Sequence, residues 1–179
     1  MSSSRADYIE SVFKRNGTDK YDHGYAKVYA TVDENISNML EVGVLEGNSL
    51  AAWEEIFPKA NIFGLDAGLK DRQFGPRVKQ LVSDVKRFDA SALPDLDLVV
   101  DDGSHRIDDI IEGWNRLHFK VHGLYIIEDV LPELFGPIWH TLMSTYPAAE
   151  IILWRTNDLH KGHPMSPMGD SHCFVVQIP

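Results

Sequence analysis

Carboxylates gather at two places in the sequence where a divalent metal ion could bind. One is the run 101–105, Asp-Asp-Gly-Ser-His, and the other is Glu128-Asp129; each directly follows an apolar segment. If the two segments are neighbouring strands, the acids converge, and their repulsion raises their pKa values unless a cation binds. Oxygen ligands favour Mg²⁺ or Mn²⁺ over zinc. The alternative is that these acids cap the helices that follow them.

His105 is the candidate general base of this site. It lies three residues after Asp102, and on the first turn of a helix that spacing would place both side chains on one side. A histidine exchanges a proton near neutral pH, so it could take one from a substrate hydroxyl. A further metal ligand or a surface histidine are the other interpretations.

A glycine turn at 41–49, Glu-Val-Gly-Val-Leu-Glu-Gly-Asn-Ser, is a second candidate site. Glycine lets the backbone approach a ligand closely, and the helix expected after the turn offers N–H groups to an anion. The glycines do not form the dinucleotide pattern, and no Lys-Ser or Lys-Thr pair provides a Walker loop. Glu41 would repel a phosphate but suits a cationic amino group, and Asp66 could accept both ribose hydroxyls. A tight turn without a ligand is the alternative.

Alternating helix and strand patterns must position these residues. The sequence predicts helices at 7–15, 24–35, 49–57, 107–117 and 131–146, and strands at 38–42, 60–65, 80–82, 96–100, 123–127, 151–154 and 173–178. Short apolar strands between helices indicate a parallel sheet covered on both faces. Such sheets bind ligands at the carboxyl ends of their strands, where four of these strands end in acids. We therefore expect an α/β fold with a Rossmann-like doubly wound sheet, mostly parallel with an antiparallel last strand.

Length and composition narrow the class of protein. A chain of 179 residues suits one domain, here 1–179, with an N-terminal helical segment at 1–36 and the sheet core at 37–179. The net charge of −10 argues against nucleic acid as a partner. The single cysteine, Cys173, allows no intramolecular disulfide and favours a cytoplasmic location. No apolar stretch reaches membrane-spanning length, so no membrane partner is expected.

The glycine turn resembles motif I of class I S-adenosylmethionine-dependent methyltransferases. The resemblance implies that Glu41, Gly43 and Ser49 surround the methionine end of this cofactor and that Asp66 holds its ribose. Asp84 follows the third strand, where the adenine is read in that family, although the local sequence Val-Ser-Asp-Val departs from the family pattern.

The acid runs resemble those of metal-dependent sugar O-methyltransferases of the macrocin and mycinamicin type. The shared motifs are Asp-Asp-Gly-Ser-His at 101–105, Ile-Glu-Asp at 127–129, and an N-terminal signature of Gly-Thr-Asp-Lys at 17–20, His-Gly-Tyr at 23–25 and Tyr29. The resemblance implies that Asp102, Glu128 and Asp129 bind the metal, expected to be Mg²⁺, and that His105 is the base. The expected reaction is methyl transfer from S-adenosylmethionine to a hydroxyl of a sugar or glycosylated small molecule.

Other functions remain open on the sequence. A catechol-type enzyme, acting on a phenol with vicinal hydroxyls, would share the same site residues. A non-catalytic module that binds S-adenosylmethionine is a different class, whereas Glu41 and the missing third glycine argue against a dinucleotide oxidoreductase. The chain is shorter than the sugar enzymes usually are, which puts their lid and oligomer contacts in doubt. We expect a small-molecule or glycan acceptor, leave a homo-oligomer open, and interpret the loop 157–171 as a lid or as a loop without a role.

Overall fold

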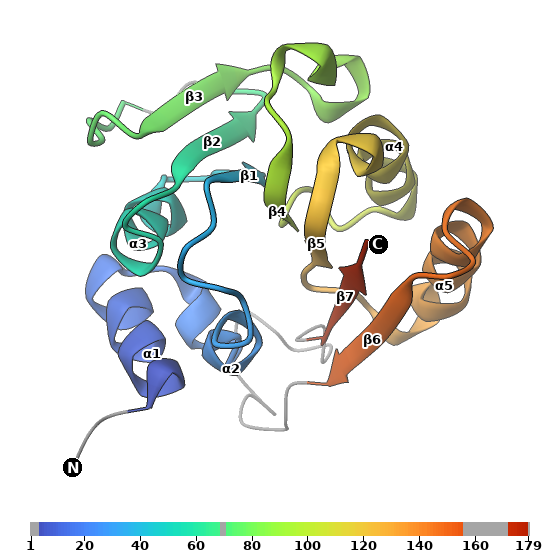
Figure 1. Ribbon diagram of the computed structural model, residues 1–179, viewed down its shortest axis with the longest axis horizontal. Coiled ribbons are helices and arrows are strands. Elements are labelled where there is room, and N and C mark those ends of the chain that lie inside the picture. Colours follow the sequence, from blue (N-terminus) through green and yellow to red (C-terminus); the bar gives the residue numbers. More distant parts are fainter. Residues whose placement is uncertain (1–3, 69–70, 156–171, 179) are drawn as a thin grey trace.

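Seven strands form one sheet in the order β3-β2-β1-β4-β5-β7-β6 (Figure 1). The computed structural model describes residues 4–68, 71–155 and 172–178. The strands are β1 (Asn38–Val42), β2 (Asn61–Asp66), β3 (Val78–Val82), β4 (Leu96–Asp101), β5 (Val121–Ile127), β6 (Glu150–Arg155) and β7 (His172–Gln177). Strands β1 to β5 are parallel to one another, and β7 runs antiparallel to both β5 and β6. The expected mostly parallel, doubly wound sheet with an antiparallel last strand is confirmed.

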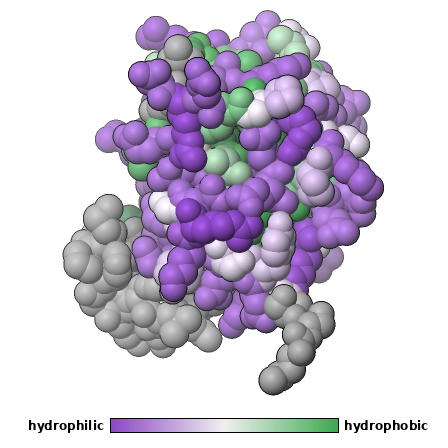
Figure 2. Space-filling view, turned by 90° about the vertical axis from the view of Figure 1, so that its left-hand side faces the viewer, coloured by the Kyte–Doolittle hydropathy of each residue, from purple (hydrophilic) through white to green (hydrophobic). Residues whose placement is uncertain are grey.

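Helices cover both faces of the sheet. They are α1 (Arg5–Asn16), α2 (Ala26–Tyr29), α3 (Asn48–Ile56), α4 (Ile107–Leu117) and α5 (Phe135–Thr145), with short 3₁₀ segments η1 (Asp19–Tyr21), η2 (Val85–Arg87), η3 (Ala90–Ala92), η4 (His118–Lys120) and η5 (Pro132–Leu134). In Figure 1, α1, α2 and α3 lie on one side of the sheet, and α4 and α5 lie on the other. The α1–α3 side looks mainly hydrophilic in Figure 2, so these helices turn their apolar faces inward.

Strand alternation explains the two cores. Successive side chains of a strand point to opposite faces of its sheet. In β1, Met39 therefore packs in the α1–α3 core and Leu40 in the α4–α5 core. Trp53 anchors the first core and Trp114 the second, and both are almost completely buried. This alternation also decides on which face each strand-end acid lies.

Two of the expected helices differ from the structure. The segment 24–35 forms only the short helix α2, since Asp33 accepts a hydrogen bond from the Asn35 backbone N–H and stabilises a turn instead. The segment 131–146 begins with η5, where Pro132 starts a 3₁₀ turn ahead of α5. Within the described ranges, no helix has the length and apolar character needed to cross a membrane.

Candidate functional site

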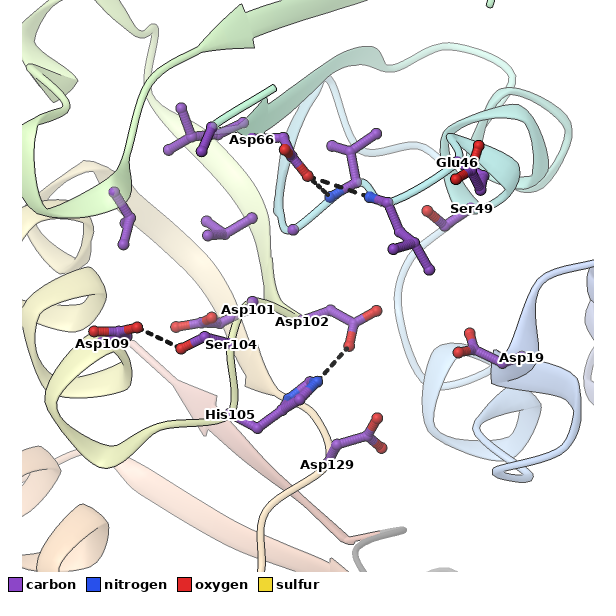
Figure 3. Close-up of a pocket in the computed structure, with 18 of the residues that line it drawn as sticks. Asp19, Glu46, Ser49, Asp66, Asp101, Asp102, Ser104, His105, Asp109 and Asp129 are labelled. Atoms are coloured by element: carbon purple, nitrogen blue, oxygen red, sulfur yellow. Dashed lines mark hydrogen bonds and ion pairs between the residues drawn. The ribbon is translucent and has the colours of Figure 1, made fainter. Parts of the chain in front are cut away.

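A cavity of about 640 Å³ opens at the carboxyl ends of the central strands (Figure 3). Its walls come from the ends of β1, β2 and β4, the glycine turn, the 17–19 segment ahead of η1, and the loop that carries His105. The volume is in the range of pockets that hold drug-sized ligands, about 300–1,000 Å³. The order β2-β1-β4-β5 makes these strand ends neighbours, as the sequence predicted.

The glycine turn adopts a conformation that glycine makes accessible. Gly43 and Gly47 have φ values of 83° and 77°, and Leu45 between them has a φ of 46°. A Cβ at Gly43 would lie 2.0 Å from the carbonyl oxygen of Asp102. The turn therefore packs directly against the acid segment, and only a residue without a side chain fits at this contact.

Asp66 fixes the turn from the end of β2. Its Oδ2 accepts the backbone N–H groups of Val44 at 2.9 Å and Leu45 at 3.2 Å, and its Oδ1 accepts that of Gly68 at 2.8 Å (Figure 3). These hydrogen bonds offset the energetic cost of the left-handed conformation of Leu45. Asp66 lies on the cavity wall, as expected of a ribose ligand, and the structure adds this support of the turn.

Glu41 lies below the cavity floor. Its side chain is completely buried, and its Oε2 accepts the hydroxyl hydrogen bond of Ser49 at 2.7 Å. Burial raises the pKa of Glu41 to about 6, although nearby Lys20 opposes the rise. Of the expected cofactor residues, Gly43, Ser49, Asp66 and Asp84 line the cavity and Glu41 does not; Asp84 also accepts the backbone N–H of Lys86 at the start of η2.

Asp102, His105 and Asp129 come together at the other end of the cavity. Each offers one ligand atom, and the three atoms lie within 4.8 Å of one another; His105 Nε2 is 4.0 Å from Asp102 Oδ1 (Figure 3). His105 lies in the turn before α4, which begins at Ile107, where the predicted helix also begins. His105 and Asp129 have φ values of 58° and 51°, a strained conformation that is typical of functional sites.

Alternation along β4 separates Asp101 from Asp102. The Asp101 side chain lies on the α4–α5 face, where it accepts a hydrogen bond from the Tyr125 hydroxyl at 3.3 Å. Burial raises the pKa of Asp101 to about 7. Asp102, one residue on, turns toward the opposite face and the cluster with His105. Asp102, and not Asp101, therefore lies beside His105 and Asp129.

Glu128 does not join this cluster in the structure. Its carboxylate is buried, with Oε1 accepting the Tyr29 hydroxyl at 2.6 Å and Oε2 accepting the Lys20 ammonium. Burial raises the pKa of Glu128, and the ammonium opposes that rise. Lys20 also donates to Asp102 Oδ2 at 2.6 Å, so it bridges the expected ligand Glu128 to the cluster.

The N-terminal signature supplies the groups that face the acids. Besides Lys20 and Tyr29, the Tyr25 hydroxyl donates to Asp129 Oδ1 at 2.5 Å, and His23 Nδ1 lies 3.1 Å from the same oxygen. Burial acts to lower the pKa of His23, but the hydrogen bond and charge of Asp129 outweigh it and raise the pKa to about 9. Type and spacing alone predicted no role for these residues. The signal that could have identified them is that buried carboxylates need groups of opposite charge nearby.

The donor set fits a hard divalent cation and the cavity fits an extended ligand with a cationic end. Asp102 and Asp129 present carboxylate oxygens, the ligand type that Mg²⁺ prefers, with an imidazole beside them. The glycine turn, fixed by Asp66, leaves backbone exposed to the adjoining part of the same cavity. Cofactor and metal would thus lie side by side.

Sequence comparison finds relatives among sugar-modifying enzymes. No model of a known protein family matches the chain. It is 30% identical, over 65% of its length, to an 8-demethyl-8-alpha-L-rhamnosyl tetracenomycin-C 2'-O-methyltransferase of Streptomyces olivaceus, and 32% identical, over 51%, to a mycinamicin VI 2''-O-methyltransferase of Micromonospora griseorubida. The matches span 36% and 27% of those proteins, so the chain corresponds to only about a third of their length.

Solved structures give the same relationship. The MycE methyltransferase of the mycinamycin biosynthetic pathway, in complex with Mg, SAH and mycinamycin VI, superposes with a TM-score of 0.65 at 26% identity, covering 75% of this chain and 40% of that one. The plantazolicin methyltransferase BpumL, in complex with SAH, has a TM-score of 0.60 at 12% identity and covers 98% of this chain, which shows the fold alone. In fold and in sequence, the chain is similar to class I S-adenosylmethionine-dependent methyltransferases.

Proposed function

We propose that this chain is the methyl-transferring unit of a metal-dependent O-methyltransferase that uses S-adenosylmethionine. The observation that carries the proposal is the position of Asp102, His105 and Asp129 within 4.8 Å of one another beside the glycine turn. A metal-binding acid pair, a base and a cofactor turn then share one cavity. The relatives' names, which are those of O-methyltransferases, support the same reaction.

We further propose that the acceptor is a sugar or a glycosylated small molecule. Polar and acidic side chains line much of the cavity, and within the described residues no phenyl, phenol or indole ring lines it. Polar walls suit the many hydroxyls of a sugar, whereas a phenolic acceptor would favour aromatic walls. This difference favours the sugar acceptor over the catechol-type alternative. The loop 157–171, interpreted from the sequence as a lid or as a loop without a role, lies outside the described residues.

In the proposed mechanism, Asp102 and Asp129 hold the metal, with Glu128 held beneath them by Lys20. The metal, when bound, makes the acceptor hydroxyl more acidic and fixes its direction. His105 accepts the hydroxyl proton. The acceptor oxygen then forms a bond to the methyl carbon as the carbon–sulfur bond breaks, and the electron pair remains on sulfur. Gly43, Ser49 and Asp66 orient the methyl donor, and Asp84 lies where its adenine would be read.

The first test separates binding from turnover. His105→Gln should retain S-adenosylhomocysteine affinity, measured by calorimetry, while methyl transfer from radiolabelled cofactor to glycosylated acceptors falls about 10²–10⁴-fold, the usual contribution of a general base. Asp102→Asn should lose metal dependence and turnover together. Ser144→Ala, on the far helix α5, serves as the matched control.

Three results would count against these proposals. Full activity in excess chelator would exclude a metal-dependent reaction. Binding of the cofactor without transfer to any glycosylated or catechol acceptor would favour a non-catalytic module. Faster transfer to catechols than to glycosides would replace the sugar acceptor by a phenol.

A further inference from the structure

Lys20 is a buried ammonium that lies between the cofactor end and the metal end of the site. Its side chain is 2% exposed. The Nζ donates to Asp102 Oδ2 at 2.6 Å and to Glu128 Oε2, and it lies 3.5 Å from Glu41 Oε1. Lys20 is therefore in direct contact with a proposed metal ligand.

The contacts of Lys20 divide the available carboxylate oxygens. Both oxygens of Glu128 are engaged, one by Lys20 and the other by the Tyr29 hydroxyl. Asp102 is shared, since its Oδ2 accepts from Lys20 while its Oδ1 faces His105. The ammonium thus occupies the oxygens on the inner side of the cluster, and the cavity side is left to Asp102 Oδ1 and Asp129.

The positions of the three carboxylates along their strands explain why all three face Lys20. Glu41, Asp102 and Glu128 each follow an α1–α3 core residue by two positions: Met39, Val100 and Ile126. Period-two alternation therefore turns all three toward the α1–α3 face, beneath which η1 carries Lys20. Three carboxylates at one buried place would repel one another, and one ammonium at their centre offsets that repulsion.

We propose that Lys20 is a positioning residue that serves as the permanent counter-cation of the site. It holds Asp102 and Glu128 in place whether or not the divalent cation is bound, and by sharing Asp102 with that cation it keeps the metal affinity low enough for exchange. The inference rests on the metal site of the proposed function. Its physical basis is that an ammonium beside a divalent site repels the ion and competes for the same oxygens.

The direction of the change in metal affinity distinguishes this role from a purely structural one. If Lys20 only maintained the shape of the site, its removal would weaken metal binding. If it is the competing counter-cation, Lys20→Met should bind Mn²⁺ at least about tenfold more tightly than the wild type, because a like charge is removed and carboxylate oxygens are released. Lys27→Met, at an exposed lysine on α2, is the matched control and should bind Mn²⁺ as the wild type does.

The experiment measures free Mn²⁺ by electron paramagnetic resonance in titrations of chelator-treated protein at pH 8. Because Lys20→Met leaves buried carboxylates without a counter-charge and is at risk of misfolding, the comparison is repeated on a neutralised background. There, the double variant Lys20→Met/Glu128→Gln should bind Mn²⁺ at least about tenfold more tightly than Glu128→Gln alone. Metal-induced shifts in melting temperature should follow the same order.

Each outcome decides a separate point. Tighter binding on either background supports the counter-cation role. Equal or weaker binding without Lys20, when the wild type binds Mn²⁺ and Asp102→Asn does not, overturns the role but leaves the proposed function standing. Binding that appears only once Lys20 is removed supports the role and counts against a metal-dependent enzyme. No binding by any variant overturns both.

Discussion

Replacing Gly43 by alanine should break the contact between the cofactor turn and the metal segment. An added Cβ would lie 2.0 Å from Asp102 O, where ordinary contact begins at 3.4 Å, so one segment must move by about 1.4 Å. The left-handed φ of 83° adds about 1–2 kcal/mol of strain, and overpacking adds about 1–3 kcal/mol. We expect unfolding free energy to fall by about 2–5 kcal/mol. Because Asp102 is displaced, turnover should fall on the order of 100-fold.

Alanine variants of two other glycines separate the backbone strain from the overpacking. Their stability is measured by urea unfolding followed by tryptophan fluorescence. Gly24 has a φ of 72°, and nothing lies within 4 Å of the place that an alanine Cβ would take, so Gly24→Ala should show the strain of about 1–2 kcal/mol alone. Gly136, in α5, has neither strain nor a neighbour within 4 Å, and its alanine variant should be no less stable than the wild type and up to about 1 kcal/mol more stable. Equal losses for Gly43→Ala and Gly24→Ala would refute the steric reasoning.

Two further predictions concern Asp66 and His118. Asp66→Asn replaces a carboxylate that accepts three backbone N–H groups, so S-adenosylhomocysteine affinity should fall about tenfold and stability by about 1–3 kcal/mol; unchanged calorimetric affinity would contradict this role. Burial lowers the pKa of His118 below its ordinary value of 6.5, so the unfolded chain takes up the proton first as the pH falls. Stability present above pH 6.5 is then lost below it. His118→Gln should flatten the pH dependence of the urea midpoint below pH 6.5, and an unchanged slope would show that His118 does not contribute.

Much of the fold could be predicted because its signals are local. Short apolar runs marked the strands, and the acids at strand ends predicted the edge at which the site lies. The short α2 was missed because the turn at Asp33 competes with a helix through one side-chain hydrogen bond, which propensity alone does not weigh. The strained turn that carries His105 was not predicted, because its conformation depends on the packing of that turn against the cavity.

The sequence by itself determined the candidate site residues: the glycine turn, the acid runs and His105 are identified by type and spacing. Only the tertiary structure decided which of these residues lie on the same face of the sheet. Strand alternation places Glu41, Asp102 and Glu128 on one face and Asp101 on the other. Lys20 reaches Asp102 and Glu128 across 82 and 108 residues of chain. Spacing cannot encode a contact at that separation, because it arises only when the α1–α3 layer packs on the sheet and burial makes unpaired charges costly.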